Sequence, residues 1–166
     1  MRARRLAQTF GAVVLVLASL AVVFEDNAFA LPAFVLASFL IFRAFLFDHR
    51  LRTALAASSV ERIPEGSMVR QGSTVGVRSR FTVPARGLVV ECTDLPPVGA
   101  TIASGSGTAR CTGPSGTATY RLLLAGRGPM EFSGIAVNAA DEFFERSIRL
   151  TGDDYRRPAI WVFPLA

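Results

Sequence analysis

The first quarter of the chain is dominated by apolar residues. Residues 6–47 read LAQTFGAVVLVLASLAVVF, then EDN, then AFALPAFVLASFLIFRAFLF. The first run has 19 residues and the second has 20, so each would form an α-helix about 28–30 Å long at a rise of about 1.5 Å per residue. The hydrocarbon core of a bilayer is about 30 Å thick. The sequence therefore predicts two transmembrane helices, at 6–24 and 28–47, joined into a hairpin by a short acidic turn.

Arginines flank both apolar runs, and the turn between the runs has none. Positively charged flanks mark the cytoplasmic ends of membrane helices, so we expect both ends of the hairpin, and the rest of the chain, to be cytoplasmic. Arginines at these positions are also suited to anionic lipid headgroups, which makes the bilayer the first predicted partner. The membrane-flanking arginines are Arg2, Arg4, Arg5, Arg43, Arg50 and Arg52.

A secretory signal peptide is the competing interpretation of the N-terminus. Residues 2–5 would be its basic region, and Ala28-Phe29-Ala30 resembles a small-residue cleavage site. The first apolar run is long for a signal peptide, however, and cleavage after Ala30 would leave a second apolar run at the new N-terminus. We therefore favour the membrane hairpin.

Residues 53–166 have the period-two pattern of half-buried strands. Val75, Val77, Phe81 and Val83 alternate with polar residues or glycine, and the run 118–124 behaves similarly. Short strands separated by turn signals predict an all-β, immunoglobulin-like antiparallel sandwich at 53–166, after a hairpin domain at 1–52. We expect residues 48–57 to continue the second helix and the Gly/Ser/Thr-rich segment 100–116 to be a hairpin tip or variable loop. The further predicted strands are 59–63, 87–93, 130–139, 143–150 and 159–163.

Composition excludes several kinds of chemistry. All 18 basic residues are arginine, so Schiff-base chemistry and a P-loop lysine are excluded. His49 is the single histidine, which leaves no histidine for a catalytic triad or zinc site in the predicted sandwich. The sandwich has 12 arginines and 10 acidic residues, too even a balance for a nucleic-acid surface. We expect a non-enzymatic protein with no catalytic residue, cofactor or metal, and no nucleic-acid partner.

Cys92 and Cys111 are the only cysteines. In an exported domain they would be candidates for a disulfide, and in a cytoplasmic one they would be reduced and at least partly buried. The absence of a Cys-x-x-C motif argues against a thioredoxin-like redox role.

Several short motifs follow one another in a characteristic order. A strand contains Val60-Glu61-Arg62, a glycine-initiated strand runs from 72 to 81, and Asp94 precedes a leucine and a proline pair. A strand beginning at Tyr120 then leads to Arg127-Gly128, Phe132 and Gly134. The segments 141–146 and 161–164 close the series.

This order resembles the N-terminal half of the "domain of unknown function 58" proteins, partners of MoxR-type AAA+ ATPases. The resemblance implies a membrane hairpin followed by a β-sandwich. The family's usual turn has a proline and a glycine where this chain has Glu142 and Phe144, and the family's von Willebrand factor A-like half is absent from this sequence. Either the chain is a short relative, or the second half is encoded separately.

The motif residues also have structural roles that their chemistry predicts without the family. Arg127-Gly128 is expected to form a turn between strands, and Gly134 to allow a bulge or a close backbone approach. Asp141 is expected to accept backbone N–H bonds in a turn from which Phe143 and Phe144 enter the core.

The leading functional prediction is a membrane-anchored β-sandwich that serves as a docking or assembly module. The resemblance implies partners such as a MoxR-type ATPase or a von Willebrand factor A protein, and a role in maturing protein complexes. Two alternatives remain open. The chain could be a structural accessory subunit of a membrane protein complex, or an exported surface domain held by a disulfide.

Overall fold

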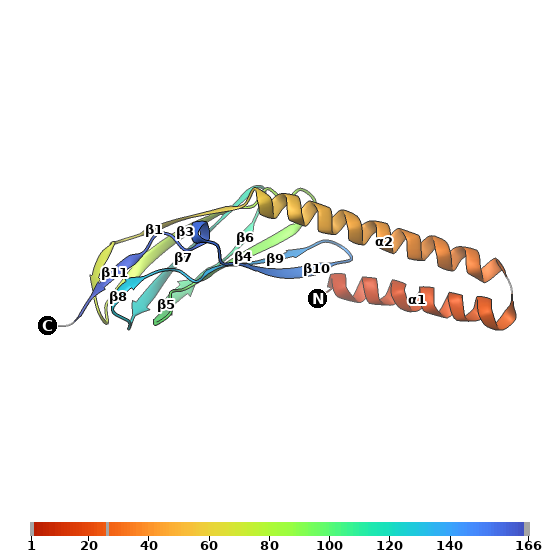
Figure 1. The fold of residues 1–166 in the computed structure, drawn as a ribbon, viewed down its shortest axis with the longest axis horizontal. Helices are drawn as coiled ribbons and strands as arrows, with labels where there is room; N and C mark the ends of the chain where they lie inside the picture. The colour runs from red at the N-terminus through yellow and green to blue at the C-terminus, as the bar shows by residue number, and fades with distance from the viewer. Residues whose placement is uncertain (1, 26, 165–166) are drawn as a thin grey trace.

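The computed structural model describes residues 2–25 and 27–164, with side chains from Leu6 onward. The chain begins with helices α1 (Arg2–Phe24) and α2 (Asn27–Ala56), which form an antiparallel pair. After α2, the regular elements of the described residues are short strands and one 3₁₀ turn. The helical pair projects from one end of the β region, and the C-terminus lies at the opposite end (Figure 1).

The two helices pass the criteria of length and composition for crossing a membrane. In the most apolar 18-residue stretch of each helix, the share of residues buried within the structure is 0% in α1 and 6% in α2. Apolar side chains such as Leu15, Val22 and Phe34 are at least 70% exposed. The predicted pair of long apolar helices is therefore confirmed, and their uncovered surface suits a membrane environment.

Helix α2 does not stop where its apolar run ends. It has 30 residues, about 45 Å at about 1.5 Å per residue, and extends to Ala56. The expectation that residues after Asp48 continue the helix is confirmed. Phe47, Leu51 and Ala54 share one face at helical spacing, are at most 6% exposed, and belong to the same buried cluster as the strands. The last turns of α2 are thus part of the core.

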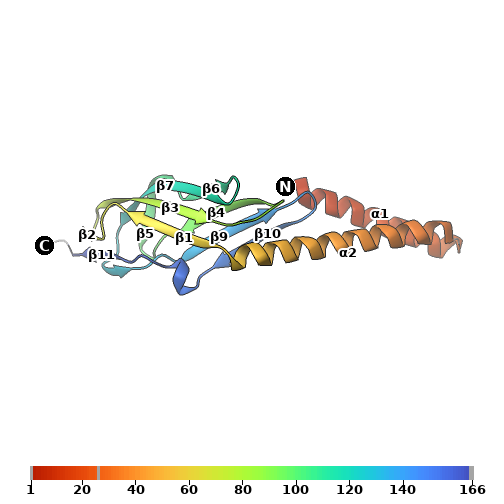
Figure 2. The same cartoon turned by 90° about the horizontal axis from the view of Figure 1, so that it is seen from above.

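The β region contains two four-stranded antiparallel sheets and a smaller third sheet. The strand order is β1-β3-β7-β5 in the first sheet and β10-β9-β4-β6 in the second. In Figure 2 the strands of both sheets overlap and run roughly along the direction of the helices. The elements are β1 (Ser59–Pro64), β2 (Met68–Arg70), β3 (Thr74–Thr82), β4 (Val89–Leu95), β5 (Ala100–Ser106), β6 (Thr108–Cys111), β7 (Ser115–Leu124), β8 (Gly128–Met130), β9 (Gly134–Ala140), β10 (Glu145–Leu150), a 3₁₀ turn η1 (Asp153–Tyr155) and β11 (Ile160–Phe163).

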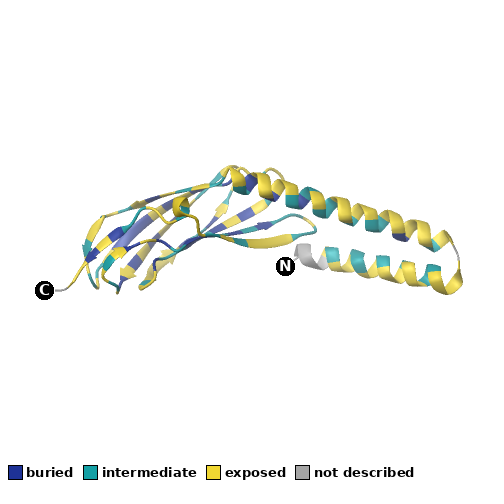
Figure 3. Cartoon of the chain, viewed as in Figure 1, coloured by how far each residue is buried: buried dark blue, intermediate teal, exposed yellow. Residues whose placement is uncertain are grey.

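Alternating burial explains how these strands form one core. In β7, Ala118, Tyr120, Leu122 and Leu124 are buried while the residues between them are exposed. Successive side chains of a strand point to opposite faces, so one face of each sheet is apolar and the other faces solvent. Figure 3 shows the buried positions concentrated in the strands and the exposed ones along the helices. The prediction of antiparallel sheets that pack in a sandwich-like arrangement after the helices is confirmed.

Three details differ from the sequence-based expectations. The segment 100–116 consists mostly of strands β5 and β6, together with the start of β7. The predicted strand 130–139 is divided between β8 and β9, because Phe132 leaves the strand to enter the core. The third sheet, β2-β11-β8, is mixed, because β11 pairs in parallel with β2. This small sheet lies at the end of the sandwich far from the helices (Figure 1).

Candidate functional site

The carboxylate of Asp94 is the centre of a densely hydrogen-bonded polar cluster in the sandwich. Its Oδ1 accepts hydrogen bonds from Arg62 Nε at 2.9 Å and from Arg62 Nη2 at 2.7 Å, and its Oδ2 accepts one from Arg62 Nε at 3.0 Å. The hydroxyls of Ser79, at 2.5 Å, and Tyr120, at 2.6 Å, donate to its second oxygen. The side chains of both charged partners are 0% exposed. Ion pairs buried in this way persist only when further hydrogen bonds satisfy the remaining polar atoms, and here they do.

Arg62 also binds the C-terminal part of the chain. Its Nη1 donates to the carbonyl oxygens of Tyr155 and Arg157, both at 2.8 Å, and its Nη2 donates to Gly134 O at 3.1 Å. The guanidinium carbon lies 4.3 Å from the centre of the Phe132 ring. The planar fork of arginine makes several directed bonds of this kind where lysine could not.

This cluster joins the two main sheets. Arg62, Ser79 and Tyr120 come from β1, β3 and β7 of the first sheet, whereas Asp94 comes from β4 of the second. Burial, and then the nearby Asp94 carboxylate, raise the pKa of Tyr120 far above its ordinary value, so the phenol stays protonated and donates. The cluster is closed to solvent. It links the two sheets through hydrogen bonds and offers no open position for a substrate.

Sequence reasoning did not foresee this cluster. Arg62, Asp94 and Tyr120 each stood in a motif of the resemblance, but as separate strand markers. A signal was available, because a charged residue of each sign inside an otherwise apolar strand pattern indicates a buried pair. Ser79 carried no signal of its own.

The turn between β9 and β10 has the predicted hydrogen bonds. Asp141 Oδ1 accepts the backbone N–H groups of Phe143 at 2.8 Å and of Phe144 at 2.7 Å. Asx turns of this type hold the backbone in place of a proline or glycine. Phe144 packs against the core, 5.8 Å from the ring centre of Phe47.

The prediction that Phe143 enters the sandwich core is wrong, because the residue packs against the two helices instead. Its ring meets Phe10 of α1 edge-on at 5.7 Å and Phe39 of α2 at 5.8 Å. The Arg43 guanidinium lies 4.9 Å from its centre and forms a 3.4 Å ion pair with Asp141. The reason is geometric, because the β9–β10 turn extends beyond the sheets toward the helical pair. This turn therefore adds a contact between the helices and the sandwich to the one made by the end of α2.

The remaining motif residues have backbone roles. Gly128 has a φ of +86° and follows the exposed Arg127 in the predicted turn between β7 and β8. Gly134 has a φ of +119°, and a Cβ at this position would collide with the carbonyl oxygen of Leu150. The predicted close backbone approach at Gly134 is confirmed.

Cys92 and Cys111 lie on the neighbouring strands β4 and β6. Their Sγ atoms are 3.7 Å apart, and both are free thiols. The hydrogen bond to Cys111, together with burial, raises the pKa of Cys92. Cys92 is buried and Cys111 is partly exposed, so only the second thiol is open to reagents.

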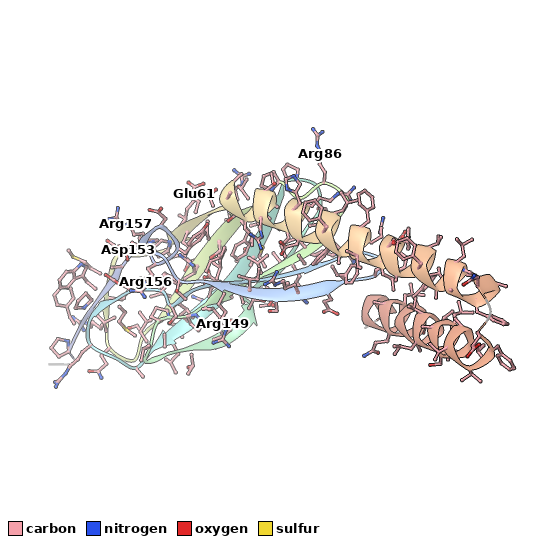
Figure 4. The ribbon with its side chains drawn as sticks, turned by 45° about the vertical axis from the view of Figure 1, so that its right-hand side comes forward. Glu61, Arg86, Arg149, Asp153, Arg156 and Arg157 are labelled. Atoms are coloured by element: carbon pink, nitrogen blue, oxygen red, sulfur yellow. The ribbon has the colours of Figure 1, made fainter. Side chains whose placement is uncertain are left out.

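A cleft of about 1000 Å³ lies where α2 enters the sandwich. We call it the helix–loop cleft. His49, Arg50 and Thr53 line it from α2, and the loop 83–88 and the start of the β6–β7 turn line it from the sandwich. Arg50 Nη1 would lie 3.3 Å from a Cβ placed on Gly87, so its guanidinium rests against this loop. Figure 4 shows Arg86 above the C-terminal part of α2, pointing outward from the molecule.

The predicted membrane-flanking arginines occupy different environments. Arg43 binds the β9–β10 turn, and Arg52 pairs with Asp48 at 2.6 Å. Asp48 also receives Arg146 of β10 at 2.7 Å. Arg50 and Arg86 have no ion pair among the described residues. The side chains of Arg2, Arg4 and Arg5 lie outside the described part of the chain, although their backbone begins α1.

Comparison with known proteins gives structural neighbours only. No family model matches the chain, and no curated protein matches it. One similar solved structure is the cupredoxin domain of amoB from Nitrosocaldus yellowstonii, at 11% identity and a TM-score of 0.31, covering 66% of this chain and 96% of that one. Another is BslA, a bacterial hydrophobin, at 18% identity and a TM-score of 0.24, covering 56% and 97%. In the described residues, no group of three or more His, Cys, Asp or Glu side chains could hold a metal ion.

Proposed function

We propose that this chain is a membrane-anchored, non-enzymatic docking or assembly module, with α1 and α2 in the bilayer and the β-sandwich at its cytoplasmic face. The observation that carries the proposal is the shape of α2. One continuous helix has an uncovered apolar surface over its first part and lies in the sandwich core over its last turns. A soluble protein would cover the first part, and a flexible tether would not be built into the core.

The strand order supports an immunoglobulin-like sandwich. The order β1-β3-β7-β5 corresponds to strands A-B-E-D of that fold, and β10-β9-β4 corresponds to G-F-C. The chain differs in the middle, where β5 of the first sheet precedes β6 of the second. Immunoglobulin-like sandwiches commonly present loops and edges to other proteins, which suits a docking role.

Anchoring is tested by flotation of the full chain with liposomes and by its resistance to alkaline extraction. Leu15, 70% exposed at the middle of α1, is replaced by aspartate, and Met68, 69% exposed on β2, is the matched control. An aspartate at the bilayer centre costs about 3 kcal/mol, so Leu15→Asp should reduce the membrane-bound fraction and Met68→Asp should leave it unchanged. Equal behaviour of the two variants would contradict membrane insertion of α1.

The side of the membrane is tested with a new thiol at a known exposed position. Val98 is 90% exposed between β4 and β5, so Val98→Cys in a chain carrying Cys92→Ala and Cys111→Ala gives a single accessible probe. A cytoplasmic sandwich leaves this cysteine unlabelled by an impermeant maleimide in intact cells and labelled after lysis. Labelling in intact cells would place the sandwich outside.

The partnership with a MoxR-type ATPase rests on the resemblance alone. It is tested by co-purification of the membrane-extracted chain with the MoxR-type ATPase encoded in the same genome, with ATP and with ADP. Retention that depends on the nucleotide supports the partnership. Fixed-stoichiometry recovery of integral membrane subunits without the ATPase would favour the accessory-subunit alternative.

The exported alternative has one specific observation in its favour. Cys92 and Cys111 lie with Sγ atoms 3.7 Å apart on neighbouring strands, so a small movement would bring them to the bonding distance of about 2.05 Å. A mobility shift on a non-reducing gel, absent in Cys111→Ser, together with labelling of Val98→Cys in intact cells, would establish that alternative.

A further inference from the structure

We propose that the helix–loop cleft binds the phosphate-bearing headgroup of an anionic phospholipid. This inference rests on the proposed membrane anchoring and adds a specific ligand site to it. The cleft is defined by His49, Arg50 and Thr53 of α2, Arg86 and Leu88 of the β3–β4 loop, and Cys111 of β6.

The position of the cleft along α2 matches the headgroup layer. Phe45, 67% exposed, is the last exposed apolar residue in the apolar run of α2, and residues 49–53 follow about 6–12 Å along the helix axis at about 1.5 Å per residue. The polar layer on each side of a bilayer is about 5–8 Å thick, the difference between about 30 Å of hydrocarbon and about 40–45 Å in total. A lipid whose acyl chains lie beside α2 therefore has its phosphate at the level of His49 and Arg50, the residues of the cleft nearest the apolar run.

The charges of the cleft match an anion. Arg50 and Arg86 are among the residues that line it, and none of the described lining residues is acidic. The acidic residue nearest in sequence, Asp48, is already bound to Arg52 and Arg146. Arg43 is likewise already paired, with Asp141 and Glu142 of the β9–β10 turn. Neither Arg50 nor Arg86 has a carboxylate partner among the described residues, so both are available to a phosphate, which the guanidinium fork binds with two N–H groups.

The cleft also has an apolar side suited to a lipid. Pro84, Ala85, Leu88 and Pro114 line it along with the polar groups. Its volume of about 1000 Å³ exceeds what an inorganic phosphate needs. A lipid headgroup with its glycerol and the first methylenes of its chains fits both the polar and the apolar walls. We therefore assign the occupant to a membrane lipid and leave free phosphate as the alternative outcome.

The test compares lipids and variants on the full chain purified in detergent. Native mass spectrometry counts bound phosphatidylglycerol and phosphatidylcholine after titration of each lipid. The test variant is Arg50→Gln with Arg86→Gln. The matched control is Arg156→Gln with Arg157→Gln, the same change of charge at exposed positions near η1, well away from the cleft (Figure 4). Labelling of Cys111, the partly exposed thiol in the cleft, gives a second readout.

We expect one tightly retained phosphatidylglycerol, which slows the labelling of Cys111. An arginine near an anionic lipid contributes about 1 kcal/mol, so losing both should weaken its retention about 30-fold, while the control changes it less than about 2-fold. Equal retention of the two lipids, or equal loss in both variants, would overturn the proposal. Protection of Cys111 by inorganic phosphate alone would assign the cleft to a free anion instead of a lipid.

Loss of lipid binding at the cleft can be distinguished from loss of membrane anchoring. The double arginine variant keeps its apolar helices, so it should still float with liposomes even after it loses the bound lipid. If it does not fold, as judged by its circular dichroism, the single variant Arg86→Gln on the exposed loop carries the same comparison.

Discussion

Replacing Asp94 by alanine removes the acceptor of the buried cluster and leaves the Arg62 charge inside the sandwich. Both side chains are 0% exposed, so water does not compensate the arginine. Breaking a buried pair by removing one partner costs about 3–5 kcal/mol. The hydroxyls of Ser79 and Tyr120 also lose their acceptor, which places the expected loss at the upper end of that range.

The effect is large relative to the stability of an ordinary domain, about 5–15 kcal/mol. With a urea dependence of about 1.5–2 kcal/mol per molar, the midpoint of unfolding should fall by about 2–3 M. The assay is urea unfolding of the full chain in detergent, followed by far-ultraviolet circular dichroism and by the fluorescence of Trp161, the single tryptophan.

Two further variants separate the ion pair from a general loss of packing. Arg62→Met with Asp94→Ala should cost less than the sum of the two single changes, because the double variant leaves no unpaired charge. Asp153→Ala removes an exposed carboxylate on η1 and should change stability by less than about 0.5 kcal/mol. The reasoning is refuted if Asp94→Ala unfolds at the wild-type midpoint, or if the stability losses of the two single variants add up to that of the double variant. Either result would mean that the cluster does not hold the sheets together.

The other predictions concern the close backbone contact at Gly134, the β9–β10 turn that contacts the helices, and the hydroxyl of Tyr120. Gly134→Ala should lower the free energy of unfolding in urea by about 3 kcal/mol, because its Cβ meets a backbone carbonyl. Gly128→Ala has open space around its Cβ and should lower it by about 1 kcal/mol. Equal losses in the two variants would contradict the close backbone contact at Gly134. Phe143→Ala should speed hydrogen exchange of the β9–β10 turn amides by about tenfold, whereas Phe34→Ala, 72% exposed, should not. Because the folded pKa of Tyr120 is raised, its contribution to stability is complete below the unfolded pKa of about 10 and is lost as the pH rises above it. Wild-type stability should therefore fall more steeply between pH 9 and 11 (roughly one unit either side of that pKa) than that of Tyr120→Phe, and parallel curves would contradict it.

The sequence was sufficient for features that depend on local pattern. The long apolar runs predicted α1 and α2, and the alternation at 118–124 predicted β7, because periodicity reports directly which side chains are buried. The hydrogen bonds of Asp141 were predictable for the same reason, since an Asx turn is formed within a few residues.

Features that depend on contacts between distant segments were not predictable. The polar, glycine-containing segment 100–106 looked like a loop, yet it forms β5 because its backbone bonds to β7, about twenty residues further along the chain. Phe143 looked like a core residue, and only the position of the helical pair beside the β9–β10 turn decides that it packs on Phe10 and Phe39. The buried pair of Arg62 and Asp94 likewise joins strands whose proximity no local pattern encodes.

The continuity of α2 has a mechanical consequence. The helix has no flexible linker between its apolar part and the turns buried in the core, and the β9–β10 turn braces it a second time through Arg43 and Phe143. Packed interiors transmit strain and do not absorb it. A change of tilt imposed on the apolar end of α2 therefore swings the whole sandwich as a rigid arm, and the small sheet of β2, β8 and β11 at the far end travels the widest arc.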